Sequence, residues 1–271
     1  MRLECLDFGF VELVDSMGSD SRVVDSARRS YGDGTKHVSS ERTLIRYMLE
    51  NGHTSPFESC VLTFHVRCPI FVARQWMRHR TWSYNELSAR YSVMPDEYFV
   101  PDVARKQSST NKQASEGELD NSSVIIDDIH AATQHARNVY EDVLEKGLSR
   151  ELARTILPVS QYTDFYGTVN LHNLFRFLKL RNHGHAQPEI RVFASAIEHI
   201  VASMYPLSYE AYCDYMRDAE QFSFKELMAI KQCLNPDSLK TIVDSLVENK
   251  TLTKGEASRF MAKLYGDDII C

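Results

Sequence analysis

The chain has 271 residues, of which 43% are hydrophobic and 25% charged, and its formal net charge is -6. These values are ordinary for a soluble globular protein of one or two domains with a sizeable core. The acidic balance disfavours a general nucleic-acid binder, because proteins of that class usually carry a basic surface.

The cysteines and the N-terminal residues further restrict the class of protein. None of the six cysteines forms a C-x-x-C pair, which leaves zinc and dithiol redox centres little support, and scattered thiols fit a reducing compartment. Glu4, Asp7, Glu12 and Asp15 near the start of the chain argue against a secretory signal, and no run of about 18 apolar residues predicts a membrane span. We therefore expect a cytoplasmic protein with neither a membrane nor a nucleic-acid partner.

Hydrophobic periodicity and helix boundary signals predict the elements in chain order. Those of the first third are one or two strands within 2–15, a helix over 20–31, a turn at 31–34, a helix over 40–51, a strand over 60–68 and a helix from Pro69 to about Met77. The strand over 60–68 rests on strict alternation of apolar and polar residues, and Pro69 suits the first turn of a helix.

Helices dominate the remainder. We expect an extended segment over 89–101, a polar, mobile loop over 105–123, helices over 123–146 and 150–157, a strand or extended link over 161–169, helices over 170–181, 188–204 and 208–217, and terminal helices over 223–234, 236–248 and 254–265. The predicted fold class is α+β, a small antiparallel sheet with several packed helices plus a C-terminal helical extension. We place the domain boundary between 1–217 and 218–271, and expect the extension to serve packing or assembly.

A polar run at 78–91 stands out from its surroundings. It contains three arginines, a histidine, a glutamate, an asparagine and two serines, interleaved with Trp82, Tyr84 and Tyr91. Guanidinium groups fit phosphate oxygens, and aromatic rings offer stacking faces for flat heterocycles. Gln75 shares a helix face with Arg78 and can line the same site. The run predicts a site for a phosphorylated, ring-bearing ligand such as a nucleotide, although a helix dipole or surface ion pairs also favour arginine here.

Other chemistries find less support. There is no phosphate-binding glycine loop, no G-x-S-x-G elbow around Ser88 and no cysteine in a Pro-Cys-His setting. His183 and His185 have no carboxylate or cysteine at ligand spacing, so we expect no metal. His53 lies in a turn, where a histidine more often makes local hydrogen bonds than acts as a catalyst. The residues alone predict a nucleotide-binding enzyme and do not specify its reaction.

The same run resembles the signature of flavin-dependent thymidylate synthases. It has Arg78-His79-Arg80, seven further residues and Ser88, within the longer pattern Arg-His-Arg-x-x-Ser-x-Asn-Glu-x-Ser-x-Arg-Tyr. Further blocks that look familial are 52–58, 69–76, 151–158, 169–170 and 180–187. The resemblance covers about residues 1–217, as a catalytic domain, and does not account for the tail. It implies an α+β homotetramer with shared active sites that contains FAD and methylates dUMP to dTMP, with methylenetetrahydrofolate as carbon donor and NADPH as reductant.

The resemblance also implies roles for individual residues. By position, dUMP would be held by Gln75, Arg78, Glu86, Leu87, Ser88, Ala89, Arg90, Arg154 and Arg181. The flavin-contacting positions are Ser30, Ser55, Arg78, His79, Arg80, Glu86, Asn170, His172, Arg176 and His185. The catalytic residues would be Arg181, which polarises the uracil, together with Ser88 and His53, the latter near the flavin ring or the folate. His172, Arg176 and Ala89 depart from the residues commonest in the family, which bears on individual contacts.

A second hypothesis is a non-catalytic nucleotide-binding or regulatory protein that kept the fold and gained the C-terminal helices. A degenerate relative of that kind would be expected to have lost part of the set formed by Ser88, Arg90, Arg154 and Arg181. This chain has all four, which favours the enzyme.

Overall fold

The computed structural model describes residues 1–31 and 40–265, so the turn expected over 31–34 lies almost wholly outside the described residues. The chain divides into two compact units, Met1–Asp218 and Ala219–Cys271. Along the described residues, no helix is both long and apolar enough to cross a membrane.

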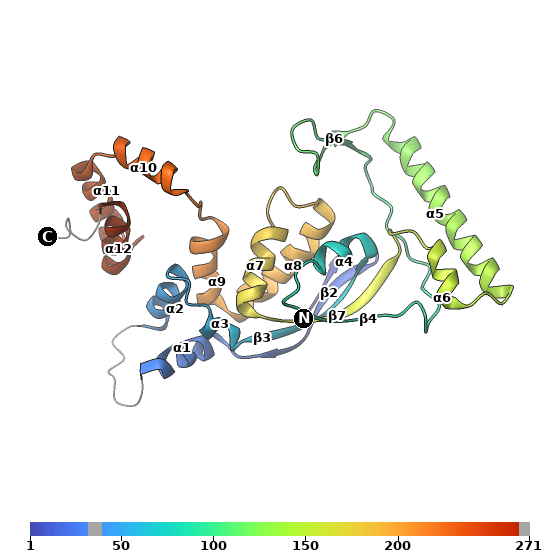
Figure 1. Cartoon of the computed structure of the whole chain (residues 1–271), viewed down its shortest axis with the longest axis horizontal. Coiled ribbons are helices and arrows are strands. Elements are labelled where there is room, and N and C mark those ends of the chain that lie inside the picture. Colours follow the sequence, from blue (N-terminus) through green and yellow to red (C-terminus); the bar gives the residue numbers. More distant parts are fainter. Residues whose placement is uncertain (32–39, 266–271) are drawn as a thin grey trace. The chain divides into compact units, whose positions relative to one another are not determined.

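The first unit is built on a five-stranded antiparallel sheet with the strand order β1-β2-β3-β7-β4 (Figure 1). Its strands are β1 (Arg2–Cys5), β2 (Gly9–Met17), β3 (Val61–Pro69), β4 (Ser83–Glu86) and β7 (Tyr162–Asn170). Strand β3 follows the predicted alternation, with Leu62, Phe64, Val66 and Cys68 buried and the residues between them partly exposed. The α+β class and the small antiparallel sheet are confirmed.

Helices α4, α7 and α8 pack against this sheet (Figure 1). The helices of the first unit are α1 (Asp20–Arg28), α2 (Glu41–Glu50), α3 (Ser55–Glu58), α4 (Ile70–Trp76), α5 (Ser122–Glu145), α6 (Arg150–Ala153), α7 (Leu171–Arg181), α8 (Pro188–Met204) and α9 (Pro206–Tyr212). Gly9 allows α8 to approach the β1–β2 turn, since a Cβ there would lie 2.8 Å from the ring of Phe193 and 2.5 Å from the carbonyl oxygen of Cys5. The buried Asp20 carboxylate ties α1 to α9 by accepting hydrogen bonds from the backbone N–H groups of Leu207 and Ser208.

Several predicted boundaries need correction. The segment over 105–123 is not a plain loop, because β5 (Arg105–Gln107) and β6 (Ser115–Glu118) pair as a two-stranded hairpin. The helix expected over 208–217 is α9 followed by a π-helical turn, Cys213–Arg217. Strand β4 was missed, since its four residues are mostly exposed and polar and show no apolar alternation.

The expectation that Trp82 and Tyr84 offer stacking faces to a ligand is wrong. Trp82 is only 5% exposed, and its ring lies 5.7 Å from that of Trp76 and 5.2 Å from that of Phe177. The half-buried Tyr84 ring stacks on Trp82, and its hydroxyl donates to the carbonyl oxygens of Trp76 and His79. These rings belong to the core and fix the chain that follows α4.

Over its described residues, 219–265, the second unit has three helices, as predicted: α10 (Phe224–Cys233), α11 (Pro236–Glu248) and α12 (Lys254–Tyr265). Ser223 and Glu226 form a reciprocal capping box at the start of α10. Val243 of α11 is buried, as are Ala257 and Leu264 of α12. These residues form the small apolar core of this unit.

Candidate active site

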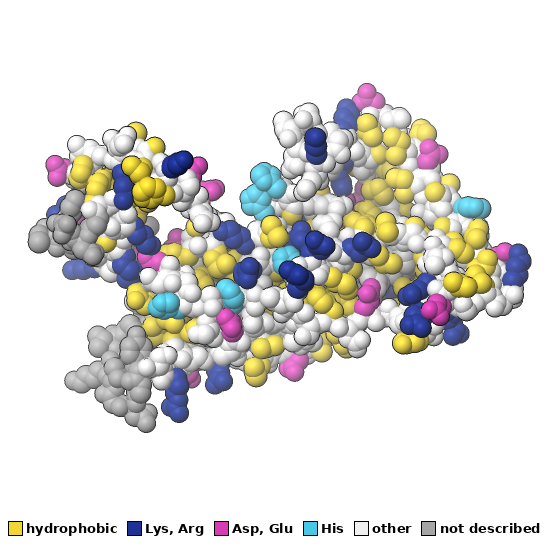
Figure 2. Space-filling model, in the orientation of Figure 1, with side chains coloured by type: hydrophobic (Ala, Val, Ile, Leu, Met, Phe, Trp, Pro, Cys, Tyr) yellow, Lys and Arg dark blue, Asp and Glu magenta, His cyan; other side chains and the backbone are white. Residues whose placement is uncertain are grey.

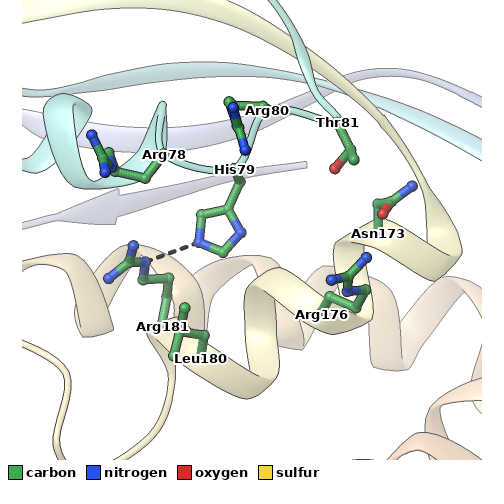
Figure 3. Close-up of a pocket in the computed structure, with 8 residues that line it drawn as sticks. All are labelled: Arg78, His79, Arg80, Thr81, Asn173, Arg176, Leu180 and Arg181. Atoms are coloured by element: carbon green, nitrogen blue, oxygen red, sulfur yellow. Dashed lines mark hydrogen bonds between the residues drawn. The ribbon is translucent and has the colours of Figure 1, made fainter.

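Lys and Arg side chains gather over α4 and α7 on one face of the first unit (Figure 2). The turn after α4 and one side of α7 enclose a cavity of about 550 Å³, which we call the arginine hollow (Figure 3). The turn contributes Arg78, His79, Arg80 and Thr81, and α7 contributes Asn173, Arg176, Leu180 and Arg181. No carboxylate lines the arginine hollow. Its lining therefore suits an anion.

Arg181 is held in a fixed orientation by two neutral acceptors. Its Nε donates to Nε2 of His79 at 3.0 Å (Figure 3). One terminal nitrogen donates to the carbonyl oxygen of Gln75 at 3.0 Å. The Gln75 side chain in turn donates to Oε1 of Gln187 at 2.5 Å, which connects α4 to the start of α8. Gln187 lies in the familial block 180–187 but was not among the residues predicted for the site.

His79 is a neutral imidazole in this arrangement. Burial, reinforced by the charges of Arg181 and Arg176, lowers the pKa of His79 from 6.5 to about 4. The geometry points the same way, because Nε2 accepts from Arg181 and so bears no proton. Burial also lowers the pKa of Arg181 itself.

A second cavity of about 330 Å³, the serine hollow, lies where β4 leaves the sheet. Its lining residues are Ile70, Glu86, Leu87, Ser88, Ala89, Met94, Arg154, Leu157 and Thr163. The Glu86 carboxylate accepts from the Thr163 hydroxyl at 2.6 Å, and the Leu87 N–H donates to the carbonyl oxygen of Asp164 at 2.8 Å. Strand β7 therefore positions the residues that enter this hollow.

Two guanidinium groups converge beside the serine hollow. Arg154 lines it, and its Nε donates to the carbonyl oxygen of Glu151 at 3.3 Å. The exposed Arg90 lies 3.6 Å from the Glu151 carboxylate, and its backbone N–H donates to the Ser88 hydroxyl at 3.3 Å. An exposed pair at this distance contributes little to stability, so both arginines are available to a ligand.

A third cavity, of about 560 Å³, lies between the end of α7 and the tip of the β5–β6 hairpin, and we call it the hairpin hollow. It is lined by Asn111, Gln113, Arg176, Lys179, Leu180, Arg181, His183, His185, Ala186 and Met216. The rings of His183 and His185 lie 4.7 Å apart. Among the described residues, no cluster of three or more His, Cys, Asp or Glu side chains could hold a metal ion.

One chain does not bring all the expected site residues together. Of the residues that the resemblance assigns to dUMP, five line the serine hollow, whereas Arg78 and Arg181 line the arginine hollow. The exposed Ser30, His53 and Ser55 line none of the three hollows. Asn170 caps α7 by accepting from the Asn173 backbone N–H at 2.9 Å.

His172 is half-buried on α7. Its Nδ1 atom is buried without a hydrogen-bond partner among the described residues, and burial lowers its pKa. An orphaned buried polar atom of this kind is uncommon in a folded protein.

Comparison with known proteins identifies the family. The family model described as "Thymidylate synthase complementing protein" matches residues 12–207. A flavin-dependent thymidylate synthase of Thermus thermophilus is 47% identical over 247 residues, which covers 91% of each chain. The chain belongs to the flavin-dependent thymidylate synthases.

Two other flavin-dependent thymidylate synthases are also similar to this chain over most of its length. The relative from Wolbachia pipientis is 46% identical and covers 86% of this chain and 84% of its own. The relative from Rickettsia conorii is 40% identical and covers 97% of this chain and 93% of its own. An alignment of that extent enters the C-terminal unit, so the expectation that the resemblance ends near residue 217 is wrong.

Solved structures extend the comparison from sequence to fold. A UMP/dUMP methylase from Streptomyces cacaoi, bound with 5-Br dUMP, is 38% identical, with a TM-score of 0.72 over 79% of this chain and 99% of that chain. The enzymatic nature and α+β fold of this flavin-dependent thymidylate synthase therefore rest on sequence and structure together.

Proposed function

We propose that the chain converts dUMP to dTMP by reductive methylation, with FAD as cofactor, methylenetetrahydrofolate as carbon donor and NADPH as reductant. The observation that carries the proposal is the arginine hollow, in which Arg181 retains a full positive charge because its hydrogen-bond acceptors are both neutral. A cation fixed in this way can act on a ligand whose charge develops during the reaction.

The lining of the arginine hollow fits the diphosphate of a dinucleotide. Arg78, Arg80 and Arg176 contribute three cations without an acidic residue beside them in the lining. The residues proposed to hold FAD are these three with Ser30, Ser55, His79, Glu86, Asn170, His172 and His185. When bound, the flavin supplies the hydride and mediates methylene transfer.

The serine hollow fits a nucleoside monophosphate. The Ser88 hydroxyl and the guanidinium groups of Arg154 and Arg90 would bind the phosphate. The Glu86 carboxylate, oriented by Thr163, would position the ligand. Gln75, Leu87 and Ala89 complete the proposed set around dUMP.

Arg181 would activate the pyrimidine without an enzyme nucleophile. Its guanidinium would stabilise negative charge as N3 of the uracil ionises, which makes C5 more nucleophilic. The hydrogen bonds to His79 and the Gln75 carbonyl hold the group in place, so that little reorganisation is required. We keep His53 as a proposed contact of the flavin or folate, on an exposed turn beside the Tyr47 ring.

We further propose that two copies of the chain complete each site within a homotetramer. The division of the expected dUMP residues between the serine and arginine hollows supports this, because Arg181 of one copy could meet Ser88 and Arg154 of another.

The test is dTMP formation by the purified protein, supplied with dUMP, methylenetetrahydrofolate and NADPH, with and without FAD. We expect Arg181→Ala to bind flavin and lose nearly all turnover. The matched control is Arg150→Ala, which removes an exposed arginine that lines none of the three hollows. Near-normal turnover in Arg181→Ala would overturn the proposed role, and a wild-type protein that binds FAD and dUMP without forming product would favour the non-catalytic hypothesis.

A further inference from the structure

The hairpin hollow carries unbalanced positive charge. Three permanent cations line it, Arg176, Lys179 and Arg181, and its lining includes no carboxylate. Among the described residues, none of these three cations lies within ion-pair distance of an acidic side chain. Gathering such cations costs Coulomb energy in a chain whose net charge is -6, and a bound anion would offset that cost.

The hairpin that closes this hollow is anchored to the core of the first unit. Arg105 of β5 pairs with Glu189, whose side chain is only 4% exposed in the first turn of α8. The Gln107 amide donates to the carbonyl oxygens of Lys112 and Ala114 at 3.1 and 3.0 Å, and so organises the tip. The tip of the hairpin therefore has a defined conformation that internal hydrogen bonds maintain.

Two amide side chains at the tip line the hollow. The Oδ1 atom of Asn111 accepts from the Gln113 backbone N–H at 3.0 Å, which directs its oxygen toward the chain. No bond from the Asn111 Nδ2 or from the Gln113 amide reaches another of the described residues. These free donors face the same cavity as Lys179 and His183, so cations and neutral donors converge on one volume.

We propose that the hairpin hollow binds a polyanionic group of a cosubstrate, held by Lys179, His183, Asn111 and Gln113 beside Arg176. The ligand chemistry is a set of closely spaced phosphate or carboxylate oxygens, which ammonium, imidazole and amide donors recognise. A cavity of about 560 Å³ has room for such a group. The inference rests on the proposed function, which supplies two cosubstrates with such groups. They are the nicotinamide reductant, through its phosphates, and the folate, through its glutamate carboxylates.

The hollow is positioned to extend the arginine hollow. Arg176, Leu180 and Arg181 line both cavities and form the ridge of α7 between them. A cosubstrate whose polyanionic end lies in the hairpin hollow would therefore direct its remaining part toward the proposed flavin site.

The experiment uses the full-length, FAD-loaded protein and the variants Lys179→Gln and Lys179→Gln/His183→Gln. The matched control is Lys112→Gln, an exposed lysine of the same hairpin tip that does not line the hollow. KM is measured for NADPH, for NADH, and for methylenetetrahydrofolate with one and with five glutamates. Loss of one charge-assisted contact should raise the affected KM about tenfold, with kcat changed much less.

The pattern of KM values separates the two sources. A rise for NADPH and NADH alike assigns the hollow to the diphosphate of the reductant, and a rise for NADPH alone assigns it to the 2′-phosphate. A rise for the pentaglutamyl folate that exceeds the rise for the monoglutamyl folate assigns it to the glutamate tail. Unchanged KM values for all four cosubstrates in both variants would overturn the proposal.

Calorimetry with inorganic tripolyphosphate provides a measurement that does not need turnover. We expect the FAD-loaded wild-type and Lys112→Gln proteins to bind this probe with equal affinity, and Lys179→Gln/His183→Gln to bind it at least about tenfold more weakly. Equal affinity in all three proteins would overturn the proposal. A wild-type protein that forms no dTMP would count against the proposed function alone, because the calorimetry would still decide this inference.

Discussion

The neutrality of His79 is the first property to test, because the hydrogen bond that orients Arg181 depends on it. At pH 7 the imidazole accepts from Arg181 at Nε2 and so carries its proton at Nδ1. Protonation at Nε2 would break this hydrogen bond and place two cations 3.0 Å apart. We therefore expect His79 to stay neutral until the solution is far more acidic than an ordinary histidine requires.

The size of the effect follows from the pKa. A fall from 6.5 to about 4 corresponds to at most about 3 kcal/mol, and because solvent reaches part of the imidazole we expect roughly half of that. Above pH 6.5 the imidazole is neutral in the folded and in the unfolded state, and its full contribution to the free energy of unfolding is present. As the pH falls from 6.5 towards 4, the unfolded chain takes up a proton that the folded protein does not, so the free energy of unfolding decreases over this window.

The assay compares the wild-type protein with His79→Gln, whose side-chain oxygen can accept from Arg181 but does not titrate. Between pH 7 and pH 4.5, denaturant unfolding should show the wild-type protein losing about 1–2 kcal/mol more than the variant. NMR of 15N-labelled histidine should give the His79 pKa directly, and Arg181→Ala should raise it. The reasoning is refuted if His79 titrates near 6.5 in the wild-type protein, or if both proteins have the same pH dependence.

Two further predictions concern stability. Trp82→Ala should lower the free energy of unfolding by about 3–5 kcal/mol in urea, because it empties a buried site, whereas Tyr91→Ala, at a residue that is 76% exposed, should cost less than about 0.5 kcal/mol. Equal costs would contradict the assignment of Trp82 to the core. Arg137→Met should cost about 1–3 kcal/mol by the same measurement, because it removes a buried hydrogen bond of 2.9 Å to the Met94 carbonyl and an ion pair with Glu141. A variant as stable as the wild-type protein would show that this arginine does not anchor α5.

The sequence predicts the parts of the fold that local periodicity determines. Strand β3 alternates strictly, α7 and α8 bear apolar stripes, and the C-terminal helices have capping residues, so all of these were predicted. Strand β4 has no such pattern. It exists because its backbone pairs with β7, from Ser83 opposite Thr168 to Glu86 opposite Phe165, and that pairing is a tertiary contact.

The β5–β6 hairpin was missed for a similar reason. Its strands are short and fully exposed, and their composition is that of a loop. What holds it is the ion pair between Arg105 and Glu189, residues that are 84 positions apart in the chain. A sequence does not show which of its many charges will pair at such a separation.

The sequence predicts which residues belong to the candidate site, but it does not predict how the fold groups them. The spacing of Arg78, Ser88 and Arg90 predicts a single nucleotide site. In the structure Arg78 lines the arginine hollow while Ser88, which follows β4, lines the serine hollow, because the buried Trp82 and the pairing of β4 separate them.

Arg181 differs from the arginines that connect segments of the first unit in the kind of acceptor that holds it. The arginines that connect segments of the first unit pair with carboxylates, as in Arg42 with Glu210, Arg46 with Asp214, Arg105 with Glu189, Arg137 with Asp96 and Arg217 with Glu198. Arg181 is equally well held, but by an imidazole nitrogen and a carbonyl oxygen, which constrain its position without cancelling its charge. A carboxylate in place of His79 would hold the guanidinium at least as firmly and would leave it little field with which to stabilise a developing anion. The neutral acceptor is therefore what makes Arg181 suited to chemistry, and protonation of His79 would remove the hydrogen bond that orients its guanidinium.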